Sequence, residues 1–171
     1  MLARLLLRTA LIAAFAILMP ACQNFGKKKQ QDNASADGDY VSGSALPERQ
    51  EGVSFLGSNV DRSRFSPVYF GFDSYEVSSG EHGKISQVAE FLRSGGSTVI
   101  VAGFTEERGT PEYNRGLGER RALAVRQALI SAGANPAKIQ TVSFGAEMPS
   151  DAGSGESAWA KNRRAEFGVT R

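Results

Sequence analysis

The uninterrupted apolar run Thr98–Phe104 (TVIVAGF) constrains the fold more than any other segment of the chain. A run without polar alternation is typical of a strand that is buried on both faces of its sheet. A helical pattern lies on each side of the run. The first ends at Gly95-Gly96, and the second begins at Pro111 or Glu112 and ends before Gly133. The sequence therefore predicts a central strand between two helices.

Three further strands are predicted from β-branched and aromatic residues. Two are short apolar segments, and the last alternates apolar with polar side chains: these strands are Val68–Phe72, Ile139–Phe144 and the segment around Ala165, Phe167 and Val169. The resulting order is βαβαβ plus a final strand, over residues 67–171. About 105 residues are enough for a single core, so we expect one α+β domain.

Two local patterns refine this prediction. Ser78 and Glu81 have the S-x-x-E spacing of a capping box, which predicts Ser78 as the N-cap of a helix that runs to about Arg93. Residues 150–157 (SDAGSGES) are small and polar, and we expect them to form a loop.

The amino terminus has the features of an export signal. Arg4 and Arg8 lie in a basic start, and an apolar stretch follows that is too short to span a bilayer comfortably. The single cysteine, Cys22, follows Ala21, as in the lipobox that this segment resembles. We therefore expect residues 1–21 to be a lipoprotein signal peptide and Cys22 to be lipidated; ordinary cleavage near Ala21 is the alternative. Gln23 in place of Asp implies the outer membrane, by the lipoprotein sorting pattern.

The following segment, residues 22–66, is predicted to be a lipidated amino terminus and a flexible tether. It is rich in Gln, Asn, Asp, Ser and Gly, and it buries little apolar area. Val53–Leu56 is a small apolar island within it, which can dock on the domain.

Composition excludes several classes of protein. The chain has 20 basic and 18 acidic residues, and residues 1–21 contain two of the basic ones and no acidic one. The remainder therefore carries no net charge, which argues against nucleic-acid binding through bulk charge. One cysteine and one histidine exclude an internal disulfide framework and a Cys/His metal cluster. We expect no metal and no cofactor.

The second helix contains an anomaly at Arg121. On a helical wheel Arg121 lies within the apolar stripe, Asn114 and Tyr113 share its face, and Arg126 points away. A charged group on a core-facing stripe needs a partner. The partner is either internal, with Glu106, Glu107 and Asp73 as candidates, or an anionic ligand at the start of the helix.

The loop from Phe104 to Pro111 adds carboxylates to this place. It joins the buried strand to a helix amino terminus, where ligands of open α/β sheets bind and where carboxylates are favoured. A guanidinium beside a carboxylate suits a zwitterionic group that resembles an amino acid.

Three motifs in this order resemble one family. GFTEERGTPEYNRGLGERRA (103–122) is similar to the peptidoglycan-binding motif of the OmpA-like family that includes the peptidoglycan-associated lipoproteins. VYFGFDSYEV (68–77) resembles the first strand of that family, and KNRRAEF (161–167) resembles its last. The resemblance implies a mixed four-stranded sheet with helices packed on one side.

The resemblance also implies a ligand, the peptide stem of peptidoglycan, held through meso-diaminopimelate. Carried over by motif, Arg121 meets the ligand carboxylate, Glu106 meets the ligand ammonium, and Arg163 lines the floor. Asn114 and the loop around Glu107, Arg108 and Gly109 complete the site. The family usually has Asp where this chain has Glu106. Three alternatives follow: Glu106 reaches the same ammonium in a shifted pocket, it binds a different diamino acid, or it turns to Arg108 or Arg121 and closes the site.

By this resemblance the chain anchors the outer membrane to the cell wall, faces the periplasm, and works with the Tol system in cell division. It is then not an enzyme and has no catalytic residues. A peptidoglycan hydrolase is the alternative, with Glu106 and Glu107 as an acid/base pair. A nucleic-acid site at Arg120, Arg121, Arg163 and Arg164 is a third, which export and neutral charge disfavour.

Overall fold

The computed structural model describes residues 54–95 and 97–171. The expected signal peptide, Cys22 and most of the expected tether lie outside these residues. The last part of the expected tether, residues 54–66, lies within them and differs from the prediction. Phe55 and Val60 are buried there, and Val60–Asp61 forms a strand, β1. The ordered domain therefore begins before Pro67, and the apolar island docks through Phe55.

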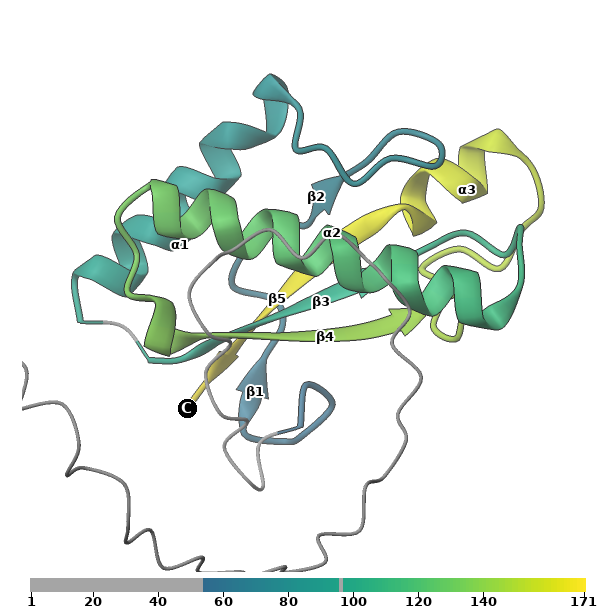
Figure 1. Cartoon of the computed structure of the whole chain (residues 1–171). Coiled ribbons are helices and arrows are strands. Elements are labelled where there is room, and N and C mark those ends of the chain that lie inside the picture. The colour runs from purple at the N-terminus through teal and green to yellow at the C-terminus, as the bar shows by residue number, and fades with distance from the viewer. Residues whose placement is uncertain (1–53, 96) are drawn as a thin grey trace, which may run out of the picture. The chain divides into compact units, whose positions relative to one another are not determined.

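The domain is built on one mixed sheet (Figure 1). Strand β3 (Val99–Phe104) lies at its centre, parallel to β4 (Ile139–Gly145) and antiparallel to β5 (Arg164–Thr170). The short strands β1 and β2 (Val68–Tyr69) both pair antiparallel with β5. Within residues 54–95 and 97–171 the sheet has five strands, one more than predicted, because β1 lies in the segment that we expected to be tether. All six residues of β3 are buried, as its apolar run predicts.

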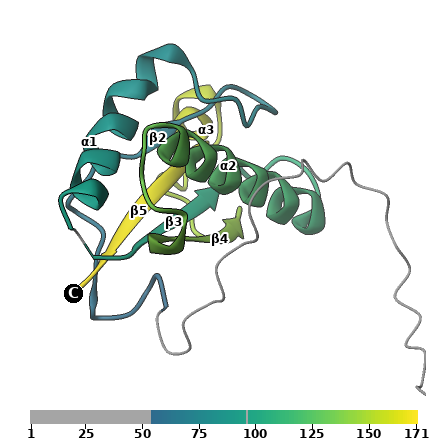
Figure 2. The same ribbon diagram turned by 60° about the vertical axis from the view of Figure 1, so that its left-hand side comes forward.

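Two helices cover one face of this sheet (Figures 1 and 2). A 3-10 turn, η1 (Ser79–Glu81), leads into α1 (His82–Arg93), and α2 (Pro111–Ser131) follows β3. Their apolar stripes pack on the sheet in a single core, which includes Val88, Leu92, Val125, Leu129, Val101 and Phe167. This arrangement confirms the α+β class with helices on one side.

The capping box predicted at Ser78 does not form. Ser78 makes no side-chain cap, and the Glu81 carboxylate instead accepts from Tyr69 N at 3.0 Å and Lys84 Nζ at 2.7 Å. Glu81 thus ties the start of α1 to β2. The cap of α2 is regular: Thr110 Oγ1 accepts from Tyr113 N at 3.2 Å, with Pro111 in the first turn.

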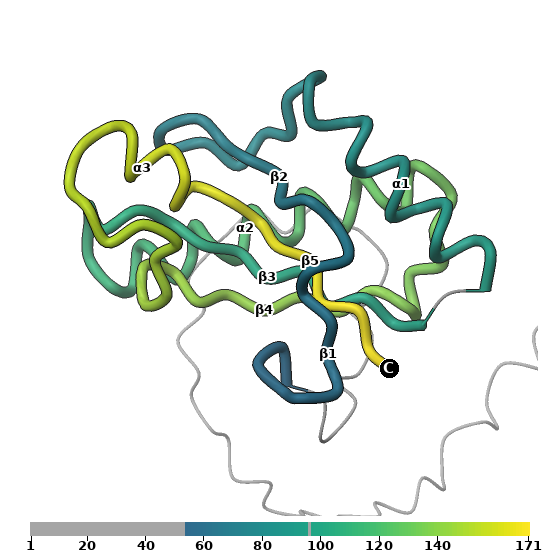
Figure 3. Tube along the Cα trace, turned by 180° about the vertical axis from the view of Figure 1, so that it is seen from behind, coloured from purple at the N-terminus to yellow at the C-terminus, as the bar shows by residue number. Residues whose placement is uncertain are grey.

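The opposite face of the sheet carries a smaller apolar cluster. Phe55 and Val60 pack there against Ile100, Ala102 and Phe104, in the segment around β1 that Figure 3 shows from behind. The rings of Phe104 and Phe144 stack, with centroids 5.4 Å apart. The residues before β2 therefore cover this face of the sheet, and they take the place of a second layer of helices.

Two glycines bring α2 close to β3. A Cβ at Gly118 would lie 2.4 Å from Ser143 Oγ and 2.9 Å from the Gly103 carbonyl oxygen. A Cβ at Gly103 would overlap the Gly118 carbonyl. The amino-terminal part of α2 therefore packs directly against the carboxyl end of β3, and a short loop joins the two elements.

A third helix was missed by the prediction. α3 (Glu156–Asn162) begins within the stretch 150–157 that we expected to be loop, and η2 (Pro136–Lys138) precedes β4. Asn162 holds the preceding loop: its Oδ1 accepts from Ser150 N and Asp151 N, and its Nδ2 donates to the Asp151 carbonyl. These bonds link residues eleven or twelve positions apart, so no local pattern announces them.

Candidate functional site

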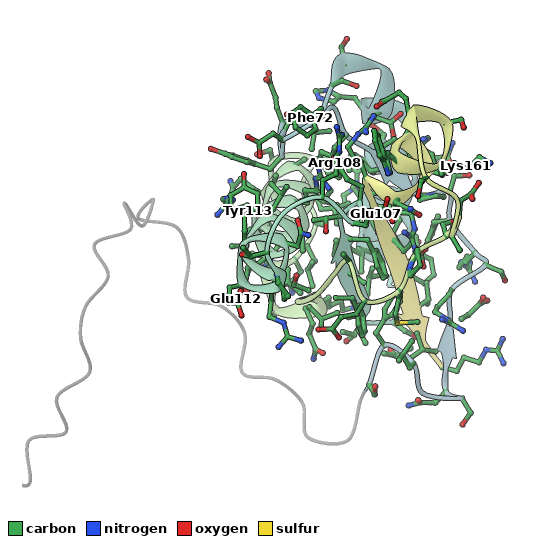
Figure 4. All side chains as sticks on the ribbon, turned by 90° about the vertical axis from the view of Figure 1, so that its right-hand side faces the viewer. Phe72, Glu107, Arg108, Glu112, Tyr113 and Lys161 are labelled. Carbon is green, nitrogen blue, oxygen red and sulfur yellow. The ribbon has the colours of Figure 1, made fainter. Side chains whose placement is uncertain are left out.

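The predicted site residues meet at one end of the domain. The loop after β3, the start of α2, the loop between β2 and η1, and α3 all converge there (Figure 1). Figure 4 looks onto this end and labels Phe72, Glu107, Arg108, Tyr113 and Lys161, which come from four of these segments. The short loop after β3 and the close approach of α2 to β3 at Gly118 place the start of α2 at this end.

Arg121 is the centre of the arrangement. Its side chain has 0% exposure and donates to three backbone carbonyls: Nε to Ser74 at 2.8 Å, Nη1 to Phe104 at 2.8 Å and Nη2 to Gly71 at 3.3 Å. Desolvation lowers the pKa of Arg121 to about 10, and the charge of Glu106 opposes that shift. The partner of Arg121 is therefore a set of carbonyls, with Glu106 nearby, and not a direct ion pair with the acids that we considered.

Glu106 is a buried carboxylate with an incomplete set of partners. The residue is 4% exposed, and its Oε1 accepts from Arg108 Nη2 at 2.8 Å. Its Oε2 is buried without a hydrogen-bond partner. A buried carboxylate oxygen without a donor is costly, so Glu106 has the capacity to accept from an additional cation.

Arg163 provides the complementary unpaired donor. It is 5% exposed, its Nε donates to the Phe70 carbonyl at 3.1 Å, and its Nη2 pairs with the exposed Glu156. Its Nη1 is buried and has no partner. Like Glu106, Arg163 interacts electrostatically with Arg121, where its charge lowers the pKa of the Arg121 guanidinium. An unpaired acceptor and an unpaired donor of opposite charge thus lie around one buried guanidinium.

Arg108 covers this cluster from the outside. Its guanidinium carbon lies 4.2 Å from the ring centroid of Phe72 and 3.9 Å from that of Trp159. Phe72 belongs to the loop after β2, and Trp159 belongs to α3. Two aromatic rings from different elements therefore contact the guanidinium that pairs with Glu106.

Glu107 has a different role from its neighbour. Its Oε1 accepts from Trp159 Nε1 and from Ser154 Oγ, each at 3.2 Å, so it positions the indole of Trp159. Glu106 and Glu107 hold different partners on different elements. This divergence disfavours the acid/base pair of the hydrolase alternative, which needs two carboxylates that flank one bond.

Asn114 and Gly109 lie together at the start of α2. Asn114 is 2% exposed, and Gly109 adopts φ +108°, a left-handed conformation that favours glycine. A Cβ at Gly109 would lie 3.4 Å from Asn114 Oδ1. The loop therefore passes closely over the Asn114 amide.

The seven residues that were predicted to bind the ligand all lie at this end of the domain.

The rim of the site is held by Tyr113 and Asp73. The Tyr113 hydroxyl donates to the Asp73 carboxylate, which raises the pKa of Tyr113. Asp73 adopts φ +50°, an uncommon conformation for a residue other than glycine. This bond fixes the loop that carries Phe72 to the first turn of α2.

The sequence interpretation missed some features of this region. Arg126 was expected to point away from the core, yet it is 5% exposed, and its Nε donates to the Ile139 carbonyl at 3.5 Å. Trp159 and Phe72 were not identified as contacts of Arg108. Phe72 was predicted as the last residue of a strand, but β2 ends at Tyr69 and Phe72 is exposed in the following loop. The distance of Trp159 and Phe72 from Arg108 in the sequence hides these contacts.

Within the described residues, no group of three or more His, Cys, Asp and Glu side chains is placed to hold a metal ion. Across the same residues, none of the helices is both long enough and apolar enough to cross a membrane.

Comparisons with known proteins agree with this architecture. Residues 69–163 match the model of the OmpA family. The peptidoglycan-associated lipoprotein of Pasteurella multocida is 44% identical over 127 residues, which cover 72% of this chain and 84% of that protein. The peptidoglycan-associated lipoprotein of Pseudomonas aeruginosa is 34% identical over 168 residues, 95% of this chain and 98% of that protein.

Solved structures show the same relationship. The crystal structure of the peptidoglycan-associated lipoprotein from Burkholderia pseudomallei has a TM-score of 0.60 and 39% identity, covering 69% of this chain and 100% of that one. The carboxy-terminal domain of Helicobacter pylori MotB has a TM-score of 0.56 at 23% identity, over 63% of this chain and 86% of that one, and shows likeness of fold alone. The chain belongs to the OmpA family, and within it to the peptidoglycan-associated lipoproteins.

Proposed function

We propose that this end of the domain binds the peptide stem of peptidoglycan without a covalent bond, through a zwitterionic diamino acid such as meso-diaminopimelate. The observation that carries the proposal is the pair of buried, unpartnered atoms, Glu106 Oε2 and Arg163 Nη1, beside the guanidinium of Arg121. An amino-acid-like group supplies an ammonium for the first atom and a carboxylate for the second. The names of the relatives, which refer to peptidoglycan, support the same ligand.

Arg121 has a positioning role in this proposal. Its three bonds to carbonyls join the loop after β2 to the end of β3, so they hold both walls of the site. Its charge also favours an anionic ligand group. With no exposed surface in this conformation, Arg121 meets the ligand carboxylate, as the family resemblance implies, only after the residues above it move.

Glu106 is proposed as the ammonium acceptor in place of the usual Asp. The longer arm already reaches Arg108, so the carboxylate is within range of a cation that enters from the same side. We propose a binding function and no enzymatic one, because Glu106 and Glu107 diverge and the relatives are named as lipoproteins.

In this proposal the amino terminus connects the binding domain to the membrane. We propose that lipidated Cys22 holds the chain in the outer membrane, with the domain in the periplasm. A tether raises the local concentration of wall ligand, so modest affinity is enough to link membrane and wall. By family resemblance the Tol system is the proposed partner, in a role during cell division.

Cosedimentation with isolated peptidoglycan tests the binding proposal. The chain from residue 23 onward is mixed with sacculi that contain meso-diaminopimelate, and with sacculi that contain lysine instead. We expect saturable pelleting with the first and at least tenfold weaker pelleting with the second. Absence of pelleting with both, for a chain whose circular dichroism is that of a folded domain, would refute the proposal.

Lipidation is tested separately. Mass spectrometry of the chain from bacterial membranes should show acyl chains on residue 22, and Cys22→Ser should release the chain from the membrane fraction. Membrane retention of the Cys22→Ser chain would contradict the anchor.

A further inference from the structure

The ion pair between Glu106 and Arg108 lies where the proposed function puts the ligand. Arg108 Nη2 is 2.8 Å from Glu106 Oε1, and the Arg108 side chain is 38% exposed while that of Glu106 is 4% exposed. Arg108 is therefore the outer member of the pair. A cation that approaches Glu106 from solvent meets Arg108 first.

Three other polar side chains of the site are closed off from solvent. Arg121 is 0% exposed, and Asn114 and Arg163 are 2% and 5% exposed. Phe72 and Trp159 contact the Arg108 guanidinium from the loop after β2 and from α3, so this one side chain bridges the two walls. Access from solvent to Glu106 Oε1 thus requires that Arg108 leave it.

We propose that the Glu106–Arg108 ion pair is an internal substitute for the ligand and that Arg108 determines specificity by exchange. The ligand ammonium replaces Arg108 at Glu106 and contacts both carboxylate oxygens, including the unpartnered Oε2. The freed guanidinium joins Arg163 in pairing with the ligand carboxylate at the mouth of the site. The inference rests on the proposed function and adds a reason for its selectivity.

The selectivity follows from charge balance. A ligand that ends in an amine alone, such as a lysine stem, satisfies Glu106 but leaves Arg108 without its carboxylate. A ligand that carries an ammonium and a carboxylate on one carbon replaces both halves of the ion pair. Because an unpaired charge in a partly desolvated site is costly, the second ligand binds more tightly.

Arg108→Gln tests the exchange directly. The measured quantity is the ratio of dissociation constants for two soluble stem peptides, one with lysine and one with meso-diaminopimelate. We expect a ratio of at least ten for the unmodified chain and a fall of at least fivefold in the variant. The lysine peptide should bind the variant more tightly, because Glu106 no longer has an internal cation.

Arg120→Gln is the matched control. Arg120 is an exposed arginine of α2 that lies 5.8 Å from the rings of Tyr75 and Tyr113, and it makes no contact with Glu106 among the interactions of the described residues. The ratio of dissociation constants for Arg120→Gln should equal that for the unmodified chain. An unchanged ratio in Arg108→Gln, or an equal fall in both variants, would overturn the exchange.

A second readout follows Arg108 itself. Trp159 is the single tryptophan of the chain, and the Arg108 guanidinium carbon lies 3.9 Å from its ring centroid. Binding of the meso-diaminopimelate peptide should change Trp159 fluorescence in the unmodified chain, and the change should be at least halved in Arg108→Gln. Binding by calorimetry with no fluorescence change would overturn the exchange but leave the proposed function intact. Failure of the unmodified chain to bind either peptide would refute both.

Discussion

The apolar core under the helices and the charged cluster at the end of β3 use the same helix in opposite ways. In the core, Val125 and Leu129 of α2 are fully buried against β3 and β5 and need no specific partner. In the cluster, Arg121 of the same helix is equally buried but depends on three carbonyls. The side chains of the core are apolar and need no hydrogen-bond partners, whereas the cluster retains unpaired Glu106 and Arg163 atoms. The first region stabilises the fold, and the second is where we propose that the ligand binds.

The largest expected effect separates core from surface. Leu129→Ala removes a fully buried side chain from the core, and we expect a loss of about 2–5 kcal/mol in the free energy of unfolding. Leu56→Ala, at a position that is 48% exposed, should cost less than about 1 kcal/mol. Urea unfolding followed by circular dichroism measures both. Similar losses at the two sites would show that the core is not the source of stability.

The next largest expected effect is a difference in the free energy of unfolding between substitutions of two buried arginines of α2. Arg121→Met removes the side-chain donor of three backbone carbonyls, of which that of Phe104 is buried, so we expect a loss of about 2–4 kcal/mol in the free energy of unfolding. Arg126 has one long bond and an unpartnered Nη2, and burial lowers its pKa. Arg126→Met should therefore be neutral or stabilising. The comparison fails if Arg126→Met is the more harmful of the two in urea unfolding.

Two glycines of α2 test how closely the helix lies on the sheet. Gly118→Ala introduces a methyl group against Ser143 and the Gly103 carbonyl, and we expect a loss of about 1–3 kcal/mol. A Cβ at Gly116 meets only the end of the Arg120 side chain, at 3.6 Å, so Gly116→Ala should stabilise the helix by up to about 1 kcal/mol. Thermal unfolding distinguishes the two signs, and a stabilising Gly118→Ala would contradict the close approach.

The smallest effect concerns the helix starts. Thr110 caps α2 through its hydroxyl, so Thr110→Ala should cost about 1 kcal/mol. Ser78 makes no side-chain cap, so Ser78→Ala should change the free energy of unfolding by less than about 0.5 kcal/mol. Chemical unfolding of the two variants side by side is the measurement. An equal loss would mean that Ser78 does cap its helix.

Regular periodicity predicted the core well. The apolar run of β3 and the stripes of α1 and α2 are local properties of the chain, so their positions followed from spacing alone. The positions of α3 and β1 did not follow from spacing, because both elements depend on residues that are distant in the sequence. Asn162 fixes the loop before α3 through its amide, and β1 has two residues that are ordered by pairing with the end of β5.

The site was predicted only where its residues stand out in the local sequence. Arg121 was anomalous on its own helix, and the nearby carboxylates were visible in the adjacent loop. The carbonyl partners of Arg121 were not, since backbone groups carry no sequence signature. The contacts of Phe72 and Trp159 with Arg108 join three segments that only the folded domain brings together.

Calorimetric titration with a soluble stem peptide that contains meso-diaminopimelate tests the central claim most directly. The unmodified chain should bind one equivalent, and Glu106→Gln should bind at least tenfold more weakly, because a charged acceptor for the ligand ammonium is lost. Glu112→Gln, at an exposed carboxylate in the first turn of α2, should bind like the unmodified chain. Equal affinity of the Glu106→Gln and unmodified chains would contradict the account.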